Sequence, residues 1–216
     1  MGSRDHDSAA ERGKPGPVPA EASYRTRGRD FLSNYLIRQL DTAWKLTSFH
    51  LVGLSTEECL WRPASSGPHV RQLPSREWRA DWPEHERYDL GPPSIAWLTW
   101  HIGFWWSMAL DHSFGEGTLS REKVTWPGSA DAVREWLTGL HEAWRKKLEQ
   151  LTDADLQSPE RTRWPFRDRP FGDVVAWVNV ELTKNAAEIG YARFLHAVQG
   201  LRTPATPSRS SDRSDG

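Results

Sequence analysis

The sequence has a single cysteine, Cys59, among its 216 residues. One thiol excludes an intramolecular disulfide framework and any metal cluster built from several cysteines. No apolar run approaches the roughly 18 residues of a membrane span, and the start of the chain lacks the apolar core of a signal peptide. These absences predict a cytoplasmic protein that has no membrane partner.

The chain also lacks an excess of charge of either sign. It contains 28 basic and 29 acidic residues in interspersed positions, which gives a formal charge of −1. Such a chain has no field that would attract nucleic acid or anionic lipid, so neither is an expected partner. The expected partner, a small-molecule substrate, follows from the candidate site described below. The motifs GxGxxG, GxxxxGK[ST], HExxH and GxSxG are absent, which leaves nucleotide-binding, zincin and serine-hydrolase functions without support.

Tryptophan is abundant, with 13 residues in the chain. Each tryptophan buries a large apolar area and carries one N–H group that needs a partner. The excess therefore predicts either an aromatic-lined cavity or a core built largely from tryptophan.

Four long helical patterns lie between two polar ends, at about residues 29–54, 94–115, 129–151 and 170–200. Capped short helices are expected at residues 55–58 (STEE) and 152–156 (TDADL). Residues 1–26 and 202–216 have the composition of disordered tails, so residues 27–201 are predicted to form one all-α four-helix domain. The connection at residues 62–93 contains six prolines and is too long for an idle loop, so we expect it to pack over the domain.

The last helical pattern places Glu181 and Asn185 in the middle of its apolar face. An unpaired carboxylate costs several kcal/mol to bury, so Glu181 needs a cation, a metal ion or a hydrogen-bond donor as its partner. A pair with Lys184 on the same helix is the simpler alternative.

A faint internal repeat suggests where such a partner lies. The segments LVGLSTEECLWRP and LEQLTDADLQSP each end a long helix and precede another helix that carries Ala-Trp near its start. Aligning Trp97 with Trp177 brings His101 onto Glu181, so a pseudo-twofold bundle would place these two side chains at equivalent heights. His101 also lies on a strongly apolar face, and the cluster has two interpretations: a functional pocket or a structural polar cluster.

The chain resembles the DinB/YfiT-like superfamily of four-helix bundles in its LSTEECLWRP turn, its SIAWL entry before His101 and its NAAEIGYARFL ending. That superfamily includes thiol-dependent transferases and isomerases that use mycothiol, bacillithiol or glutathione. Its members bind a divalent metal through one His on the second helix and a His-x-x-x-His pair on the fourth. His101 matches the first position, whereas Glu181 and Asn185 replace the pair, which predicts weaker zinc or nickel binding and a relative preference for a harder ion.

Three functions follow from this resemblance and these residues. The first is a thiol-dependent transferase or isomerase, with a divalent metal on His101, Glu181 and Asn185 and a low-molecular-weight thiol as cofactor. In that enzyme His101 and Glu181 are the catalytic residues, and the substrate-binding residues are Trp97, Trp105, Asn185 and Glu188. The second function is a non-catalytic small-molecule-binding bundle whose His/Glu/Asn cluster is free of metal. The third is a structural bundle that works as a homodimer.

Overall fold

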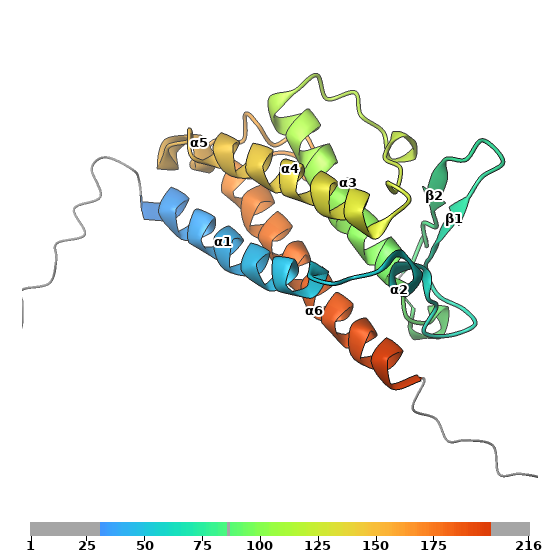
Figure 1. The fold of residues 1–216 in the computed structure, drawn as a ribbon. Coiled ribbons are helices and arrows are strands. Elements are labelled where there is room, and N and C mark those ends of the chain that lie inside the picture. The colour runs from blue at the N-terminus through green and yellow to red at the C-terminus, as the bar shows by residue number, and fades with distance from the viewer. Residues whose placement is uncertain (1–30, 86, 200–216) are drawn as a thin grey trace, which may run out of the picture.

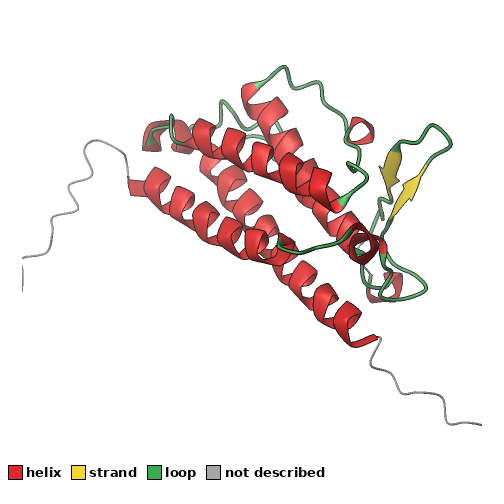
Figure 2. Cartoon of the chain, in the orientation of Figure 1, coloured by secondary structure: helices red, strands yellow, loops and turns green. Residues whose placement is uncertain are grey.

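The computed structural model describes residues 31–85 and 87–199, and helices dominate it (Figures 1 and 2). The long helices are α1 (Phe31–Leu51), α3 (Ile95–Phe114), α4 (Ala130–Leu148) and α6 (Phe171–Gln199). The short helices are α2 (Thr56–Leu60) and α5 (Asp153–Gln157). The predicted all-α four-helix architecture is confirmed, and the predicted tails at residues 1–26 and 202–216 lie outside the described residues.

The long helices pack so that each has at least two long neighbours. Helix α6 packs against α1 and α3, and α4 packs against α3 and α1 (Figure 1). Helices α1 and α6 run in the same direction. Near their starts, Asn179 Nδ2 donates to the Leu36 carbonyl at 2.9 Å, and further along Arg193 Nη1 donates to the His50 carbonyl at 2.7 Å. None of the described helices combines the length and hydropathy that crossing a bilayer requires.

Side-chain caps explain where most of the helices begin. The hydroxyls of Ser55, Ser94 and Ser129 accept hydrogen bonds from backbone N–H groups in the first turns of α2, α3 and α4. Thr152 and Asp155 form a reciprocal capping box at the start of α5. Each cap satisfies helix-end donors that have no partner within the helix, so the short polar segments in the sequence determine these boundaries.

Tryptophan fills much of the core. Trp100, Trp106, Trp126 and Trp144 are almost completely buried. The indole N–H of Trp100 donates to the Val124 carbonyl at 2.8 Å, and that of Trp126 donates to Thr99 Oγ1 at 3.1 Å. A tryptophan-built core therefore accounts for these four residues.

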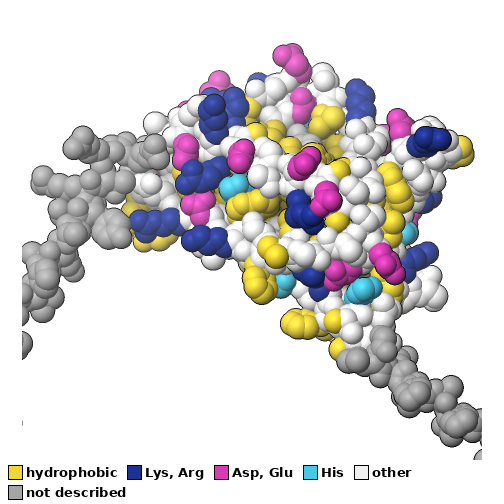
Figure 3. All heavy atoms as spheres, viewed as in Figure 1, with side chains coloured by type: hydrophobic (Ala, Val, Ile, Leu, Met, Phe, Trp, Pro, Cys, Tyr) yellow, Lys and Arg dark blue, Asp and Glu magenta, His cyan; other side chains and the backbone are white. Residues whose placement is uncertain are grey.

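Apolar side chains also remain exposed on the outer faces of α1 and α6. Figure 3 shows some of them as hydrophobic side chains along the lower edge of the molecule. They are Phe31, Tyr35, Leu46 and Phe49 on α1, Val52 directly after it, and Val180, Tyr191, Phe194 and Val198 on α6.

The long connection between α2 and α3 contains a small hairpin that the sequence analysis does not predict. Strands β1 (Val70–Gln72) and β2 (Trp78–Ala80) pair antiparallel, with Arg71 opposite Arg79. After the hairpin, the Trp82 ring packs edge-on against Phe104 at a centroid distance of 5.3 Å. The connection therefore packs over the N-terminal half of α3, in agreement with the expectation that it covers part of the domain.

Two helical glycines allow a test of how closely α3 and α4 pack. A Cβ atom on Gly103 of α3 would overlap the six-membered ring of Trp136 on α4, whereas a Cβ on Gly139 of α4 would meet no atom within 4 Å. We expect Gly103→Ala to lower the free energy of unfolding by about 1–3 kcal/mol, because overpacking forces the indole to move. Gly139→Ala is the matched control and should raise it by about 0.5–1 kcal/mol through helix propensity.

Denaturant unfolding of the two variants measures both changes. If Gly103→Ala stabilises the protein as Gly139→Ala does, Trp136 does not pack closely against Gly103.

Candidate functional site

His101 lies in the second turn of α3 and is only 6% exposed. Aromatic side chains surround its ring. Trp97 stacks on it at a centroid distance of 4.6 Å and an interplanar angle of 17°, and Trp105 meets it edge-on at 5.5 Å. The imidazole is thus held inside an apolar shell, where each ring nitrogen needs a hydrogen-bond partner.

A chain of hydrogen bonds assigns the tautomer of that ring. Asn185 Nδ2 donates to the Glu181 carbonyl at 2.6 Å, which turns Asn185 Oδ1 toward His101 Nδ1 at 3.1 Å. Because an amide oxygen only accepts, His101 Nδ1 must carry the proton, and Nε2 is left as an acceptor. Trp105 Nε1–H donates to that Nε2 at 2.8 Å, so both ring nitrogens have partners inside the protein. We call His101, Asn185 and Trp105 the imidazole triad.

Burial lowers the pKa of His101 to about 4, because the charged imidazolium would be poorly solvated there. The hydrogen bond to Asn185 opposes this shift, and the positive charge of Lys184 adds to it. His101 is therefore neutral at physiological pH, in agreement with the tautomer that the hydrogen bonds assign.

Glu181 has a different partner from the one expected from the internal repeat. Its Oε2 atom lies 2.9 Å from Lys184 Nζ, and its side chain is 16% exposed. No hydrogen bond or ion pair joins it to His101 among the described residues. The ring meets Asn185 instead, one helical turn further along α6, because residues four positions apart share a helix face. The alternative of a Glu181–Lys184 pair is the one that the structure shows.

The donor set at this position does not suit a resident divalent ion. Zinc and related ions bind an imidazole nitrogen through its lone pair, and here the Nε2 lone pair of His101 accepts the Trp105 N–H. Within residues 31–85 and 87–199, no group of three or more His, Cys, Asp or Glu side chains could hold a metal ion. The predicted metal ligands thus include one contacting pair, His101 and Asn185, and a carboxylate that is paired with a lysine.

Little open space lies beside the imidazole triad. The cavity that touches Trp105, Glu181 and Asn185 has a volume of about 10 Å³, roughly the least space that can hold one water molecule. A larger cavity of about 390 Å³, the Trp97 cavity, is lined by Trp97, Lys184 and Glu188 together with part of the connection. Two of the four predicted substrate-binding residues, Trp97 and Glu188, therefore line a space that can hold a small molecule, whereas Trp105 and Asn185 do not.

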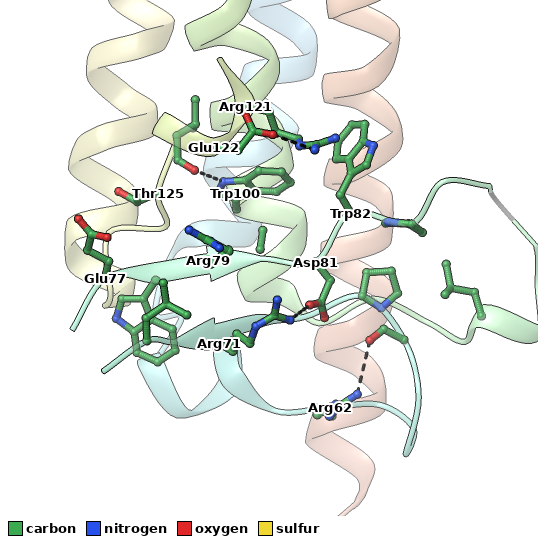
Figure 4. Close-up of a pocket in the computed structure, with 18 of the residues that line it drawn as sticks. Arg62, Arg71, Glu77, Arg79, Asp81, Trp82, Trp100, Arg121, Glu122 and Thr125 are labelled. Atoms are coloured by element: carbon green, nitrogen blue, oxygen red, sulfur yellow. Dashed lines mark hydrogen bonds and ion pairs between the residues drawn. The ribbon is translucent and has the colours of Figure 1, made fainter. Parts of the chain in front are cut away.

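Another cavity, with a volume of about 790 Å³, is lined by a different part of the same connection (Figure 4). Pro68, Pro83 and Leu90 contribute to the walls of both this cavity and the Trp97 cavity. We call it the arginine cavity after four lining residues that the sequence analysis does not single out: Arg62, Arg71, Arg79 and Arg121. A hairpin signal could have found two of them, because Pro74 and Ser75 mark a turn between segments that carry Arg71 and Arg79.

Other reactive side chains have structural surroundings. Cys59 is fully buried, and burial together with the charge of Glu58 raises the pKa of its thiol to about 12. His112 Nε2 lies 3.0 Å from the Leu119 carbonyl, and the His50 ring lies against the backbone of Gly190. These contacts give Cys59, His50 and His112 structural roles.

The family model of the DinB superfamily matches residues 39–189, which is well over half of the chain. The chain therefore belongs to the DinB superfamily, as its resemblance in sequence indicates. Comparison with curated proteins and with solved structures finds no significant match.

The buried imidazole predicts a specific loss of stability in acid. Because the pKa of His101 falls from 6.5 in the unfolded chain to about 4 in the folded one, the unfolded chain takes up the proton first as the pH drops. The free energy of unfolding therefore falls as the pH drops from about 6.5 to 4 and levels off below pH 4. The total loss due to this ring is on the order of 3 kcal/mol.

Denaturant unfolding at a series of pH values measures this slope. His101→Gln should remove its share of the slope and leave the share of His141, whose pKa burial also lowers to about 4. His141→Gln is the matched control and should remove only the contribution of His141 to the slope. An unchanged slope in His101→Gln would show that the ring is not buried in its neutral form.

Proposed function

We propose that this chain is a small-molecule-binding member of the DinB superfamily in which the imidazole triad is a metal-free structural support. The observation that supports this most directly is the pair of hydrogen bonds to His101, which engage both ring nitrogens with side chains of the protein. A ring held in this way does not titrate near neutral pH and offers no lone pair to a ligand. Its role is to hold its neighbours in place.

The neighbour that matters most for binding is Trp97. One face of its ring stacks on His101, and its Nε1–H donates to the Asp81 carbonyl at 2.7 Å. These two contacts fix the indole where it lines the Trp97 cavity. A preorganised aromatic wall loses little conformational freedom on binding, and a volume of about 390 Å³ lies within the usual range for ligand pockets.

The ligand that suits this cavity is a small aromatic or apolar molecule with a polar group. Trp97, Pro83 and Pro93 supply flat apolar contacts, and Arg87, Lys184 and Glu188 add charged groups of both signs, of which Lys184 also pairs with Glu181. An uncharged molecule that can both donate and accept hydrogen bonds would meet both charges favourably.

The thiol-dependent transferase or isomerase that the resemblance implies requires a metal site that these side chains do not form. The homodimer expected from the sequence stays a prediction.

Metal analysis tests the first half of the proposal. After growth in medium supplemented with zinc, nickel and manganese, the purified protein should retain far less than one equivalent of any of these ions, and His101→Ala should not change the amount. His85→Ala, at an exposed position outside the triad, is the control for non-specific binding. A stoichiometric ion that His101→Ala and Glu181→Ala both release would overturn the metal-free assignment.

Indole N–H resonances test the second half. Titration of the protein with indole, as a neutral aromatic probe, should shift the Trp97 N–H signal, which is identified by its loss in Trp97→Phe. The signal of fully buried Trp144 should stay in place and serves as the internal control. If a panel of neutral aromatic molecules leaves the Trp97 signal unmoved, the Trp97 cavity is not the binding site.

A further inference from the structure

The arginine cavity is a second candidate site, and its charged lining residues are all different from those of the Trp97 cavity. It lies between the β1–β2 hairpin, the turn Arg121–Lys123 and the Trp100 side of α3, as Figure 4 shows. Its volume of about 790 Å³ is large enough for an organic molecule of two or more rings.

Two arginines face each other across the hairpin. Arg71 and Arg79 are directly opposite in the strand register, so both side chains emerge on the same face of the sheet. Like charges in this arrangement destabilise a sheet, and three-residue strands have little other stabilisation with which to offset the repulsion. An anion between the two guanidinium groups would remove that repulsion.

The surrounding carboxylates neutralise only some of the arginines. Asp81 forms an ion pair with Arg71, and Glu122 forms one with Arg121 at 2.9 Å. The Arg79 guanidinium makes no hydrogen bond or ion pair with any side chain that the structure describes, although it lines the cavity (Figure 4).

Two further charged groups complete the lining. Arg62 donates to the Gly67 carbonyl at 3.5 Å, and the third carboxylate, Glu77, accepts from the Ser75 hydroxyl at 3.4 Å. Figure 4 shows Glu77 at the left of the cavity and Arg62 at its lower edge. With four arginines and three carboxylates, the lining has a net charge of +1.

Rigid aromatic side chains form the remaining walls. Trp100 is fixed by its hydrogen bond to the Val124 carbonyl, and Trp78 packs edge-on against Trp126 at 5.1 Å. The guanidinium of Arg121 lies 4.7 Å from the centre of the Trp82 ring, which orients that indole as well. Flat surfaces of this kind favour a flat ligand.

From these observations we infer that the arginine cavity binds a planar organic anion, whose carboxylate or phosphate group is held by Arg79 with Arg71 beside it. A guanidinium group matches either anion with two parallel hydrogen bonds, and the aromatic walls take the flat body of the ligand. This site goes beyond the proposed function, because it shares none of the residues of the imidazole triad.

Calorimetry of the full chain with 2-naphthoate and 2-naphthamide tests the inference, because the two probes share a ring system and differ in charge. The wild-type protein should bind the carboxylate at least tenfold more tightly than the amide, and added salt should weaken only the carboxylate. Arg79→Gln should abolish this preference. Arg76→Gln, which removes one charge from the same hairpin at a position outside the cavity, should preserve it.

Thermal unfolding of the same variants separates binding from folding. Arg79→Gln should be at least as stable as the wild type, because it removes the repulsion between Arg71 and Arg79. Equal affinity for the two probes, or an equal loss of preference in Arg76→Gln and Arg79→Gln, would overturn the inference. Inorganic phosphate that binds as tightly as 2-naphthoate would overturn the role of the planar body.

Discussion

The burial of one neutral imidazole determines how α3 and α6 pack against each other around His101. His101 lies inside an aromatic shell, where a charged or half-satisfied ring would cost several kcal/mol. Asn185 and Trp105 satisfy its two nitrogens from α6 and from the next turn of α3. The resulting triad ties α3 to α6 at one height and supports Trp97, which the connection between α2 and α3 then covers.

The surroundings of His101 differ in only one contact from those of a typical metal-binding histidine. A ligating histidine commonly donates one ring N–H to an oxygen acceptor and points its other nitrogen at the metal. His101 has the first half of that arrangement, because its Nδ1–H donates to Asn185 Oδ1. The Trp105 N–H occupies the direction that a metal would take. The Nε2 lone pair of His101, which could bind a metal ion, therefore accepts the Trp105 N–H instead.

Much of the fold follows from local signals in the sequence. The apolar stripes and the caps at Ser55, Ser94, Ser129 and Thr152 place all four long helices and both short ones to within a few residues. The inward position of His101 follows from the same periodicity. The identity of its partner on α6 does not follow from periodicity, because side chains one helical turn apart point in the same direction. Periodicity alone cannot show whether the ring meets residue 181 or residue 185. In the structure Glu181 pairs with Lys184, and the ring meets Asn185.

Periodicity does not predict the hairpin or the arginine cavity, for a different reason. Strands of three residues contain too few side chains to show an alternation, and their partners are set by the turn and by packing on α3. The charged residues of the arginine cavity therefore look like solvated loop residues in the sequence. Only the register that places Arg71 opposite Arg79, and the single carboxylate that pairs with Arg71, reveal an excess of positive charge at one point. In this protein the periodicity of the sequence predicts the helices, whereas both larger cavities are lined mainly by the connection that packs over them.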